Sequence, residues 1–423
     1  MNKNKVIAGI ELGSSKISTI IANVSSEVST GEIQVNVVGV ASVESKGIKK
    51  GQIVDIEEAV EATINSVEGA ERMAGYRLDS AYVSVGGAHL SSQNSRGVVA
   101  VSDPNGEISE SDVERVIEAA SAISLPQSRE VIHVLPREFI VDGEEGVKDP
   151  QGMNGVRLEV ETHIVTAGAP ALKNLRKAVN DVGINVEGLV FSGLASSEAV
   201  LSPTERELGC VLVDLGGGTT SIAVFIDGSL TFSSVIPVGA KNITNDLAIG
   251  LRVPLESAEK IKVVLSSGSN NKNKPKEAED ELDLNELGIE DVKKVSKKTL
   301  VEGIIRPRLN EIFTVVRIEL EKTNLLNLVP SGVVITGGGA ETIGITDSAK
   351  RMLSLPVRIG RPSKIGGLID DIINPSFAVP VGLILFGAKE TPDRKIDSLT
   401  KGFKLPSVGF AGKLVDIVKN LLP

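Results

Sequence analysis

Residues Val211–Phe225 place an aspartate, three glycines and two threonines between two apolar runs, in the order VLVDLGGGTTSIAVF. The apolar runs predict two short strands, so the glycines form the tip of a hairpin. A tip with so little side chain exposes successive backbone N–H groups, which can bind an anion. Asp214 repels a bare phosphate, but Mg²⁺ takes carboxylate and phosphate oxygens together. By itself, this stretch fits a plain turn as well as a magnesium-phosphate site.

A second stretch, near the N-terminus, repeats the pattern. Val6–Ala22 reads VIAGIELGSSKISTIIA, again a strand, an acidic residue, a turn and a strand. Glu11 takes the place of Asp214, and Lys16 supplies a cation where terminal phosphates would lie. The turn itself is made by Gly13, Ser14 and Ser15.

A third glycine cluster lies in Val333–Glu341, VVITGGGAE, where a buried strand leads into a helical pattern. Glycines allow a close approach between backbone and a flat or bulky group. Two phosphate-type hairpins followed by this cluster indicate an internally duplicated α/β fold that holds one nucleotide between its halves.

This order of motifs resembles that of the actin, Hsp70 and sugar-kinase superfamily. Two long stretches, Val131–Val160 and Gly193–Phe225, are similar to the bacterial FtsA family of cell-division proteins, as is SAEKIK at Ser257–Lys262. The likeness runs roughly from Lys5 to Gly387, and VIHVLP, at the start of the first stretch, is its most specific part.

The resemblance implies a duplicated, two-lobed actin-like (ribonuclease H-like) α/β fold. Lobe 1 would comprise residues 1–83 and 164–197, and an FtsA-type insert would comprise 84–163. Lobe 2 would comprise 198–239 and 300–387, and a small subdomain would comprise 240–299. A linker at 388–406 and an amphipathic helix at 407–423 would follow. The segment 266–298 is polar and departs from the basic segment usual in the family, so we expect a solvated, partly disordered insertion there.

Residue patterns also predict individual elements within these parts. We expect strands at 5–12, 16–24, 33–43 and from Ala81, and helices at Asp55–Ala74, Ser111–Ile123, Ala169–Val182, Ser197–Glu207 and Leu300–Lys322.

The resemblance further implies that ATP and Mg²⁺ bind between the lobes. Asp214 and Glu11 would hold the metal through water, because Mg²⁺ loses its hydration shell reluctantly. The phosphates would contact Gly13, Ser14, Ser15, Lys16, Gly216, Gly217, Gly218 and Thr219. The nucleotide would also contact Thr220, Gly239 and Asn242. Sugar and base would contact Glu259, Lys260, Gly337, Gly338, Gly339 and Ala340. Without the resemblance, Glu259 and Lys260 are interpreted as a solvated pair on a helix.

Composition excludes several other functions. The net charge of −10 leaves no surplus of cations to replace counterions on nucleic acid, so we expect no nucleic-acid partner. The single cysteine, Cys210, cannot form an internal disulfide. The apolar stretch from Val6 is interrupted by Glu11 and Lys16, so we expect no leader peptide and a cytoplasmic body. The three histidines have no metal-ligand spacing.

Whether the protein is a catalyst stays open at this point. Hydrolysis of ATP needs a group that orients water toward the terminal phosphate, and no residue is identified for this role from sequence. Glu11 also replaces the aspartate common in the wider superfamily. We expect slow hydrolysis at most, with the nucleotide acting as a clamp that sets the angle between the lobes.

The C-terminal stretch is amphipathic when wound as a helix. Its apolar side carries Phe410, Leu414, Ile417, Val418 and Leu421, and its polar side Lys413, Asp416, Lys419 and Asn420. At about 20 Å such a helix is too short to span a bilayer. It could dock on the body of the protein or lie in the membrane interface. The family resemblance favours the membrane.

Four functions compete for this sequence. The leading hypothesis is an actin-like, ATP-binding protein that polymerises on the inner face of the cytoplasmic membrane at the septum. It would anchor the tubulin-like division protein FtsZ and recruit other division proteins. The runner-up is a PilM-like component of type IV pilus assembly. A sugar kinase would need an acidic catalytic base, for which we find no motif. An Hsp70-like chaperone would need a peptide-binding domain, and too little chain follows Gly387.

The amphipathic pattern yields a test. Leu414→Asp removes roughly 1.5–3 kcal/mol of apolar burial and adds a charge to the inserted side. We expect the fraction of assembled protein that sediments with anionic lipid vesicles to fall about tenfold or more. Asn420→Asp adds the same charge to the polar side and should change this fraction little. Equal sedimentation of wild type and Leu414→Asp would rule out membrane binding through this side.

Overall fold

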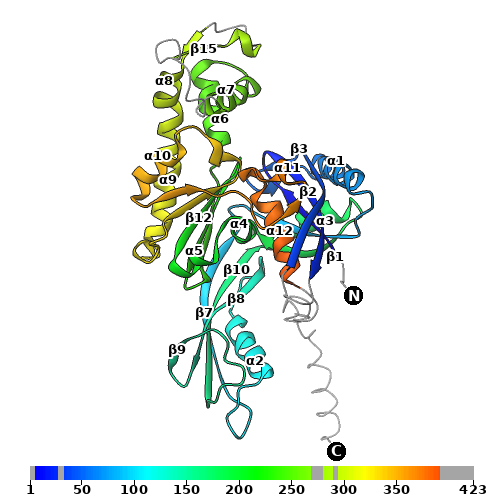
Figure 1. Cartoon of the computed structure of the whole chain (residues 1–423), viewed down its shortest axis with the longest axis vertical. Coiled ribbons are helices and arrows are strands. Elements are labelled where there is room, and N and C mark those ends of the chain that lie inside the picture. The colour runs from blue at the N-terminus through cyan, green and yellow to red at the C-terminus, as the bar shows by residue number, and fades with distance from the viewer. Residues whose placement is uncertain (1–4, 27–32, 268–279, 289–293, 391–423) are drawn as a thin grey trace, which may run out of the picture. The chain divides into compact units, whose positions relative to one another are not determined.

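A computed structural model describes residues 5–26, 33–267, 280–288 and 294–390 (Figure 1). The chain up to Lys389 is one compact unit. Most of the predicted linker (388–406) and all of the predicted amphipathic helix (407–423), with Phe410, Leu414, Ile417, Val418 and Leu421, lie outside the described residues. Among the helices of the described ranges, none combines the length and apolar character that crossing a bilayer requires.

Two mixed sheets share one topology, and this confirms the predicted duplication. In each, three antiparallel strands are followed by two parallel ones. The first sheet has the order β11 (Asn185–Phe191), β6 (Ser80–Val85), β1 (Lys5–Leu12), β2 (Lys16–Ser26), β3 (Ile33–Glu44) and β19 (Gly366–Gly367). The second has the order β14 (Ser229–Ile236), β13 (Thr220–Ile226), β12 (Cys210–Leu215), β17 (Val333–Thr336) and β18 (Val357–Ile359).

The central strands are apolar because both of their faces are covered. All six residues of β12 are buried, including Asp214 at its end. Such near-continuous Val, Ile and Leu runs are typical of strands enclosed on both sides. Cys210 is a buried free thiol in this strand.

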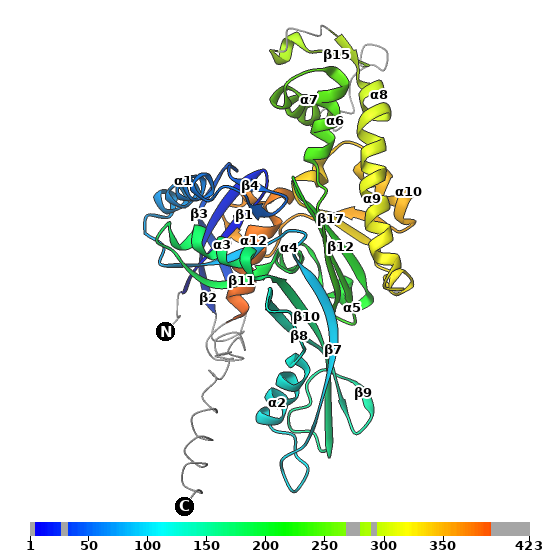
Figure 2. The same ribbon diagram turned by 180° about the vertical axis from the view of Figure 1, so that it is seen from behind.

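The inserted subdomain between β6 and the helix α3 (Ala169–Asn180) has its own sheet and core (Figure 2). It consists of β7 (Ser91–Ala100), α2 (Glu110–Ser121), β8 (Arg129–Val141), β9 (Glu144–Val147) and β10 (Arg157–Gly168). Side chains join it to β14 of the second sheet: Ser92 Oγ donates to the carbonyl of Ser233 at 2.7 Å, and His163 Nε2 lies 2.9 Å from Ser233 Oγ.

A helical subdomain follows β14. It contains α6 (Lys241–Leu251), α7 (Leu255–Ser267), β15 (Glu281–Asp283), a 3-10 turn at Asn285–Leu287, β16 (Lys294–Ser296), α8 (Lys297–Leu300), a π-helical turn at Val301–Ile305 and α9 (Arg306–Glu321). The predicted polar insertion therefore includes an antiparallel pair, β15 with β16, and Leu282 in this pair is buried. The long helix predicted at 300–322 is present, with a change of winding near its start.

Two helices, α4 (Ser192–Val200) and α12 (Ala378–Lys389), pack against each other between the two sheets (Figure 1). α4 follows β11 of the first sheet and contacts β12 and β13 of the second, whereas α12 contacts β1 and β2 of the first sheet. A Cβ at Gly382 would overlap the carbonyl of Ala195. Glycine at this position thus allows the two backbones to touch.

Most predicted helices are confirmed within a few residues, but one is wrong. α1 (Ile56–Ala74) starts after Asp55, whose side chain accepts from the N–H of Glu58. The single helix predicted at 197–207 is two helices, α4 and α5 (Pro203–Leu208). The break falls at Ser202, which is extended and caps α5, and Pro203 fixes the backbone at the first position of the new helix.

The remaining short elements connect these parts. They are β4 (Ile48–Lys49), β5 (Gln52–Ile53), a 3-10 turn at Leu326–Leu328, the 3-10 turn η5 (Gly338–Glu341), α10 (Ile345–Leu353), α11 (Ile369–Ile372) and the 3-10 turn η6 (Pro375–Phe377).

The α4–α12 crossing predicts a large effect of one substitution. Gly382→Val would force apart α4 and α12, the two helices that together contact both sheets. The free energy of unfolding should therefore fall by about 3 kcal/mol or more. Gly303→Ala is the control, because a Cβ there meets no atom of the described part of the chain within 4 Å. Its stability should be unchanged or slightly higher. Chemical denaturation of the two variants measures this; equal stability would contradict a close crossing.

Candidate nucleotide site

The two hairpins predicted from sequence have the same turn. The N–H of Gly13 donates to the carbonyl of Lys16 at 3.1 Å, and the N–H of Gly216 donates to that of Thr219 at 2.9 Å. Glu11 lies opposite Ser18 in its hairpin, as Asp214 lies opposite Ser221 in the other. The predicted equivalence of the two acidic residues is therefore confirmed.

The tips of the two hairpins touch each other. A Cβ at Gly217 would overlap Ser15 Oγ, and one at Gly218 would lie 2.8 Å from the Ser14 side chain. Lys241 strengthens the contact, because its Nζ donates to the carbonyl of Ser14 at 2.8 Å. Sequence positions far apart are thus brought together, and only glycine allows this approach.

The start of α6 orients the amides of the second tip. The N–H groups of Ala240 and Lys241 donate to the carbonyls of Gly216 and Gly217, at 2.9 and 2.8 Å. In a trans peptide the N–H points opposite to the carbonyl. The N–H groups of Gly217 and Gly218, which share peptide units with these two carbonyls, therefore point away from α6. Among the described residues, no backbone carbonyl accepts the N–H of Gly217 or of Gly218. These amides are suited to an anion.

Gly239 and Asn242 support this arrangement from behind. The N–H of Gly239 donates to Asn242 Oδ1 at 3.2 Å, and a Cβ at Gly239 would lie 2.5 Å from the carbonyl of Gly217. Thr220 is also engaged internally, because its Oγ1 donates to the carbonyl of Val238 at 2.7 Å. These three residues shape the tip from positions beside it.

Glu11 and Asp214 line one pocket between the hairpins. Its wall also includes Leu12, Gly13, Ser14, Gly51, Ser84, Gly86, Ser192, Gly216, Thr219, Ser221 and Val379. Of these, sequence reasoning missed Leu12 of β1, Ser221 of β13 and Val379 of α12, and also Gly51, Ser84, Gly86 and Ser192. The last four come from the β4–β5 turn and the ends of β6 and β11, and the Gly86–Gly87 pair after a predicted strand was the available signal.

Burial perturbs both carboxyl groups. Desolvation raises the pKa of Asp214 to about 7, opposed by a hydrogen bond from Ser196. Desolvation also raises the pKa of Glu11; the charge of Lys16 opposes this rise and that of Asp214 adds to it. Glu11 Oε2 is buried and has no hydrogen-bond partner among the residues that the structure describes.

These observations fit a divalent cation. A buried, unpartnered carboxylate oxygen beside a second carboxylate is stabilised by a cation and costly without one. Within the described residues, no three His, Cys, Asp or Glu side chains gather to hold a metal alone. Two carboxylates with phosphate oxygens and water match what Mg²⁺ takes.

Lys16 lies beside the pocket and not in its wall. Its Nζ donates to Ser376 Oγ at 3.1 Å and is 3.5 Å from the centre of the Phe377 ring. Burial lowers the pKa of Lys16, while the charges of Glu11 and Glu341 raise it. The ammonium group is thus held by η6, which leads into α12.

The third glycine cluster closes the end of β12. Gly337 has a positive φ of 83°, and a Cβ there would overlap Asp214 Oδ1. A Cβ at Gly339 would similarly crowd Leu215. Gly338 and Ala340 follow in η5, and Ala340 is buried. The cluster therefore lies against the acidic residue, as its predicted role in one shared site requires.

The predicted sugar contacts are not part of this pocket wall. Glu259 Oε2 accepts from Lys262 Nζ at 2.7 Å and from Thr244 Oγ1 at 2.5 Å. Lys260 is exposed on α7. Contacts of Glu259 and Lys260 with a ribose stay a prediction.

Two of the three histidines make buried packing contacts. His133 Nε2 accepts from the N–H of Phe191 at 3.0 Å, and His163 bonds Asn94 and Ser233. Burial lowers the pKa of His133 and of His163 to about 4. His89 lies next to the pocket, on the loop after β6.

Comparison with protein families gives two matches. The family described as "SHS2 domain inserted in FTSA" matches residues 87–166, which corresponds to the inserted sheet. The family described as "Cell division protein FtsA" matches residues 211–382, from β12 into α12.

Individual relatives span nearly the whole chain. "Cell division protein FtsA" of Pseudomonas aeruginosa is 37% identical over 93% of this chain and 92% of its own length. The protein of that name from Borreliella burgdorferi is 39% identical over 96% of both chains. The one from Bacillus subtilis is 37% identical over 96% of this chain and 88% of its own.

Solved structures share the fold at low identity. The "PilM-PilN type IV pilus biogenesis complex" aligns with a TM-score of 0.61 and 17% identity, over 90% of this chain and 98% of that chain. MreB5 of Spiroplasma citri bound to ADP aligns with a TM-score of 0.51 and 14% identity, over 91% and 97%. These likenesses show the actin-like fold.

The burial of Asp214 predicts that removing its charge stabilises the fold and weakens ligand binding. Because the pKa of Asp214 rises from 3.8 to about 7 on folding, its stabilising contribution is present below about pH 4 and is lost as pH rises through 7. Asparagine does not ionise. In EDTA at pH 8, Asp214→Asn should therefore raise the free energy of unfolding, by roughly 1–3 kcal/mol, while weakening magnesium-dependent nucleotide binding.

Urea titration at pH 8 and pH 5 measures the first effect, which should shrink at the lower pH. Asp181→Asn is the control, since this aspartate forms an exposed ion pair with Lys177 and should change stability by less than about 1 kcal/mol. A destabilised Asp214→Asn at pH 8 would contradict the assigned burial cost.

Proposed function

This chain belongs to the FtsA family of actin-like cell-division proteins, and we propose that it is an ATP-binding assembly protein that attaches FtsZ to the inner face of the cytoplasmic membrane at the septum. The observation that carries the proposal is the 37–39% identity to proteins named "Cell division protein FtsA" over more than nine-tenths of the chain. Identity of this extent covers both hairpins and the insert together.

Nucleotide binding is supported by the paired hairpins. The N–H groups of the two tips would hold the phosphates from opposite sides, Lys16 would neutralise them, and Glu11 and Asp214 would hold Mg²⁺. Bound Mg²⁺ would supply positive charge that offsets the phosphates and the two buried carboxylates together. Spiroplasma MreB5, which shares the fold, was solved with ADP and with AMPPNP.

The shared core explains how a ligand at the tips would act on the whole chain. Both lobes contribute one tip, and α4 and α12 pass between them with touching backbones. A ligand that binds one spacing of the tips better than another shifts the lobes toward that spacing. We propose that ATP binding selects the lobe angle that is competent for filament formation, with slow hydrolysis at most.

Membrane attachment is proposed from the amphipathic pattern at Phe410–Leu421. Five apolar side chains half-inserted would contribute roughly 4–7 kcal/mol, against about 1 kcal/mol of lost helix propensity at each of Gly409 and Gly412 and the cost of ordering the chain. One copy would bind weakly. Copies joined in a filament would bind strongly through effective concentration.

The pilus alternative is less well supported. The PilM–PilN complex shares the fold at 17% identity, which carries no function with it. The relatives named "Cell division protein FtsA", at more than twice that identity, favour cell division. We accordingly propose that other division proteins are partners of this chain.

Cosedimentation with vesicles tests the proposal. We expect FtsZ to pellet with anionic vesicles when full-length protein and Mg–ATP are present, and not when the protein ends after Glu390. The truncation retains α12 and the pocket, so both proteins should bind ATP equally. Pelleting of FtsZ with the truncated protein, or absence of pelleting with the full chain, would contradict the anchoring role.

A further inference from the structure

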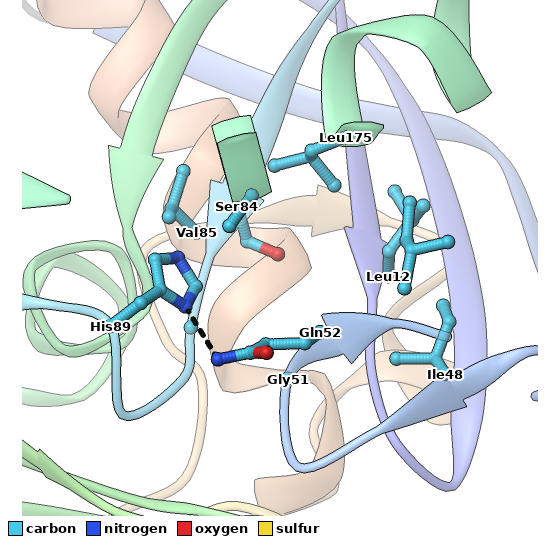
Figure 3. Close-up of a pocket in the computed structure, with 11 residues that line it drawn as sticks. Leu12, Ile48, Gly51, Gln52, Ser84, Val85, His89 and Leu175 are labelled. Carbon is cyan, nitrogen blue, oxygen red and sulfur yellow. Dashed lines mark hydrogen bonds between the residues drawn. The ribbon is translucent and has the colours of Figure 1, made fainter. Parts of the chain in front are cut away.

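A second pocket adjoins the one that holds the acidic pair, and the two share Leu12, Gly51, Ser84 and Gly86. The β4–β5 turn, the loop after β6 and α3 form its wall. Ser84, Gln52 and His89 contribute polar side chains to this wall, and Figure 3 shows the amide of Gln52 directed toward the ring of His89. They belong to separate elements, so the fold brings them together.

The backbone fixes Gln52 next to the first hairpin tip. The N–H of Gly51 donates to Ser14 Oγ at 2.9 Å. Lys50 and Gly51 both have positive φ, 50° and 71°, and a Cβ at Gly51 would overlap the carbonyl of Gly86. Lysine in this conformation is strained, and such strain concentrates at functional sites. The β4–β5 turn thus lies between the first hairpin tip, proposed to bind phosphate, and the loop that carries His89.

His89 is held from its own side. Arg129 Nη2 donates to the carbonyl of His89 at 3.2 Å, and a Cβ at Gly87 would lie 2.8 Å from His89 Nδ1. Burial and the charge of Arg129 lower the pKa of His89, so its ring is neutral near pH 7. The Arg129 bond holds the backbone of His89, and the ring lies so close to Gly87 that a side chain there would collide with it.

The contact between the two side chains defines which ring nitrogen of His89 carries the proton. Gln52 Nε2 lies 3.4 Å from His89 Nδ1. An amide nitrogen only donates, so Nδ1 accepts and the ring proton is on Nε2. Within the described part of the chain, Oε1 of Gln52 has no hydrogen-bond partner. This leaves Oε1 of Gln52 as an acceptor for a water molecule, in the wall next to the first hairpin tip.

We propose that Gln52 orients the water that attacks the terminal phosphate of the bound nucleoside triphosphate, and that His89 is a positioning residue that holds the Gln52 amide. The inference rests on the nucleotide site proposed above and assigns the group that sequence analysis did not find. Glutamine has this role in other nucleotide hydrolases, where it aligns water opposite the leaving group. Parallel β1 and β6 both end at this edge of the sheet, where ligands of α/β sheets bind.

The reaction balances without a further reagent. The water oxygen forms a bond to the terminal phosphorus while the bond from phosphorus to the bridging oxygen breaks, and that electron pair leaves with the nucleoside diphosphate. Both water protons stay on the released phosphate, so ATP⁴⁻ and water give ADP³⁻ and H₂PO₄⁻. Gln52 accepts a hydrogen bond from the water and is unchanged.

The ring resonances of His89 test the inference without relying on turnover. The chain has three histidines, so isotope labelling of histidine alone gives few signals, and His89→Asn identifies one of them. We expect Mg²⁺ with a non-hydrolysable ATP analogue to shift the His89 resonances more than Mg–ADP does. Gln52→Ala should abolish this difference, whereas His163 should not respond.

Hydrolysis and affinity complete the test. Gln52→Ala should lower the single-turnover hydrolysis rate tenfold or more and leave the Kd for Mg–ADP unchanged within about twofold. Gln151→Ala removes the same side chain from an exposed loop of the insert and should affect neither. Unchanged ADP affinity also shows that the Gln52 variant is folded.

The outcomes separate this inference from the proposed function. If the ATP analogue and ADP bind but move the His89 resonances equally, or if Gln52→Ala hydrolyses ATP at the wild-type rate, the water-orienting role is wrong and the nucleotide site stands. If wild-type protein binds neither nucleotide in the presence of Mg²⁺, the proposed function is wrong and this inference fails with it.

Discussion

Two buried carboxyl groups, Glu11 and Asp214, constrain the rest of this structure. Each lies near the end of a central strand at the start of a hairpin turn, and desolvation raises the pKa of both. Placing them together costs stability unless a cation joins them. The fold nonetheless brings them from opposite halves of the chain into one pocket. That arrangement is understandable as a binding site and not as a device for stability.

Close backbone approaches keep this pair in place. The tips meet at Gly217 and Gly218, the third cluster reaches Asp214 through Gly337, and α4 meets α12 at Gly382. Each contact lies between parts of the chain that are distant in sequence. Because packed interiors transmit strain, we expect a change of spacing at the tips to reach the two helices that connect the sheets.

Sequence reasoning reached the hairpins, the duplication and the family, because those depend on local patterns of apolar residues, glycine and acid. It included Thr220 among the nucleotide contacts, which stays a prediction, and in the structure the Thr220 hydroxyl donates to the carbonyl of Val238. It merged α4 and α5 across Ser202, since the two helices are separated by only two residues, Leu201 and Ser202. The pairing of Gln52 with His89 depends on positive φ at Lys50 and Gly51 and on a tertiary contact, and neither leaves a pattern in sequence.

The central claim is that both tips hold one nucleotide, and amide hydrogen exchange at the two turns measures it most directly. Addition of Mg–ATP should slow exchange together in peptides covering 13–16 and 216–219, with the same midpoint concentration. Protection of only one turn, or of neither at millimolar Mg–ATP, would contradict a shared site.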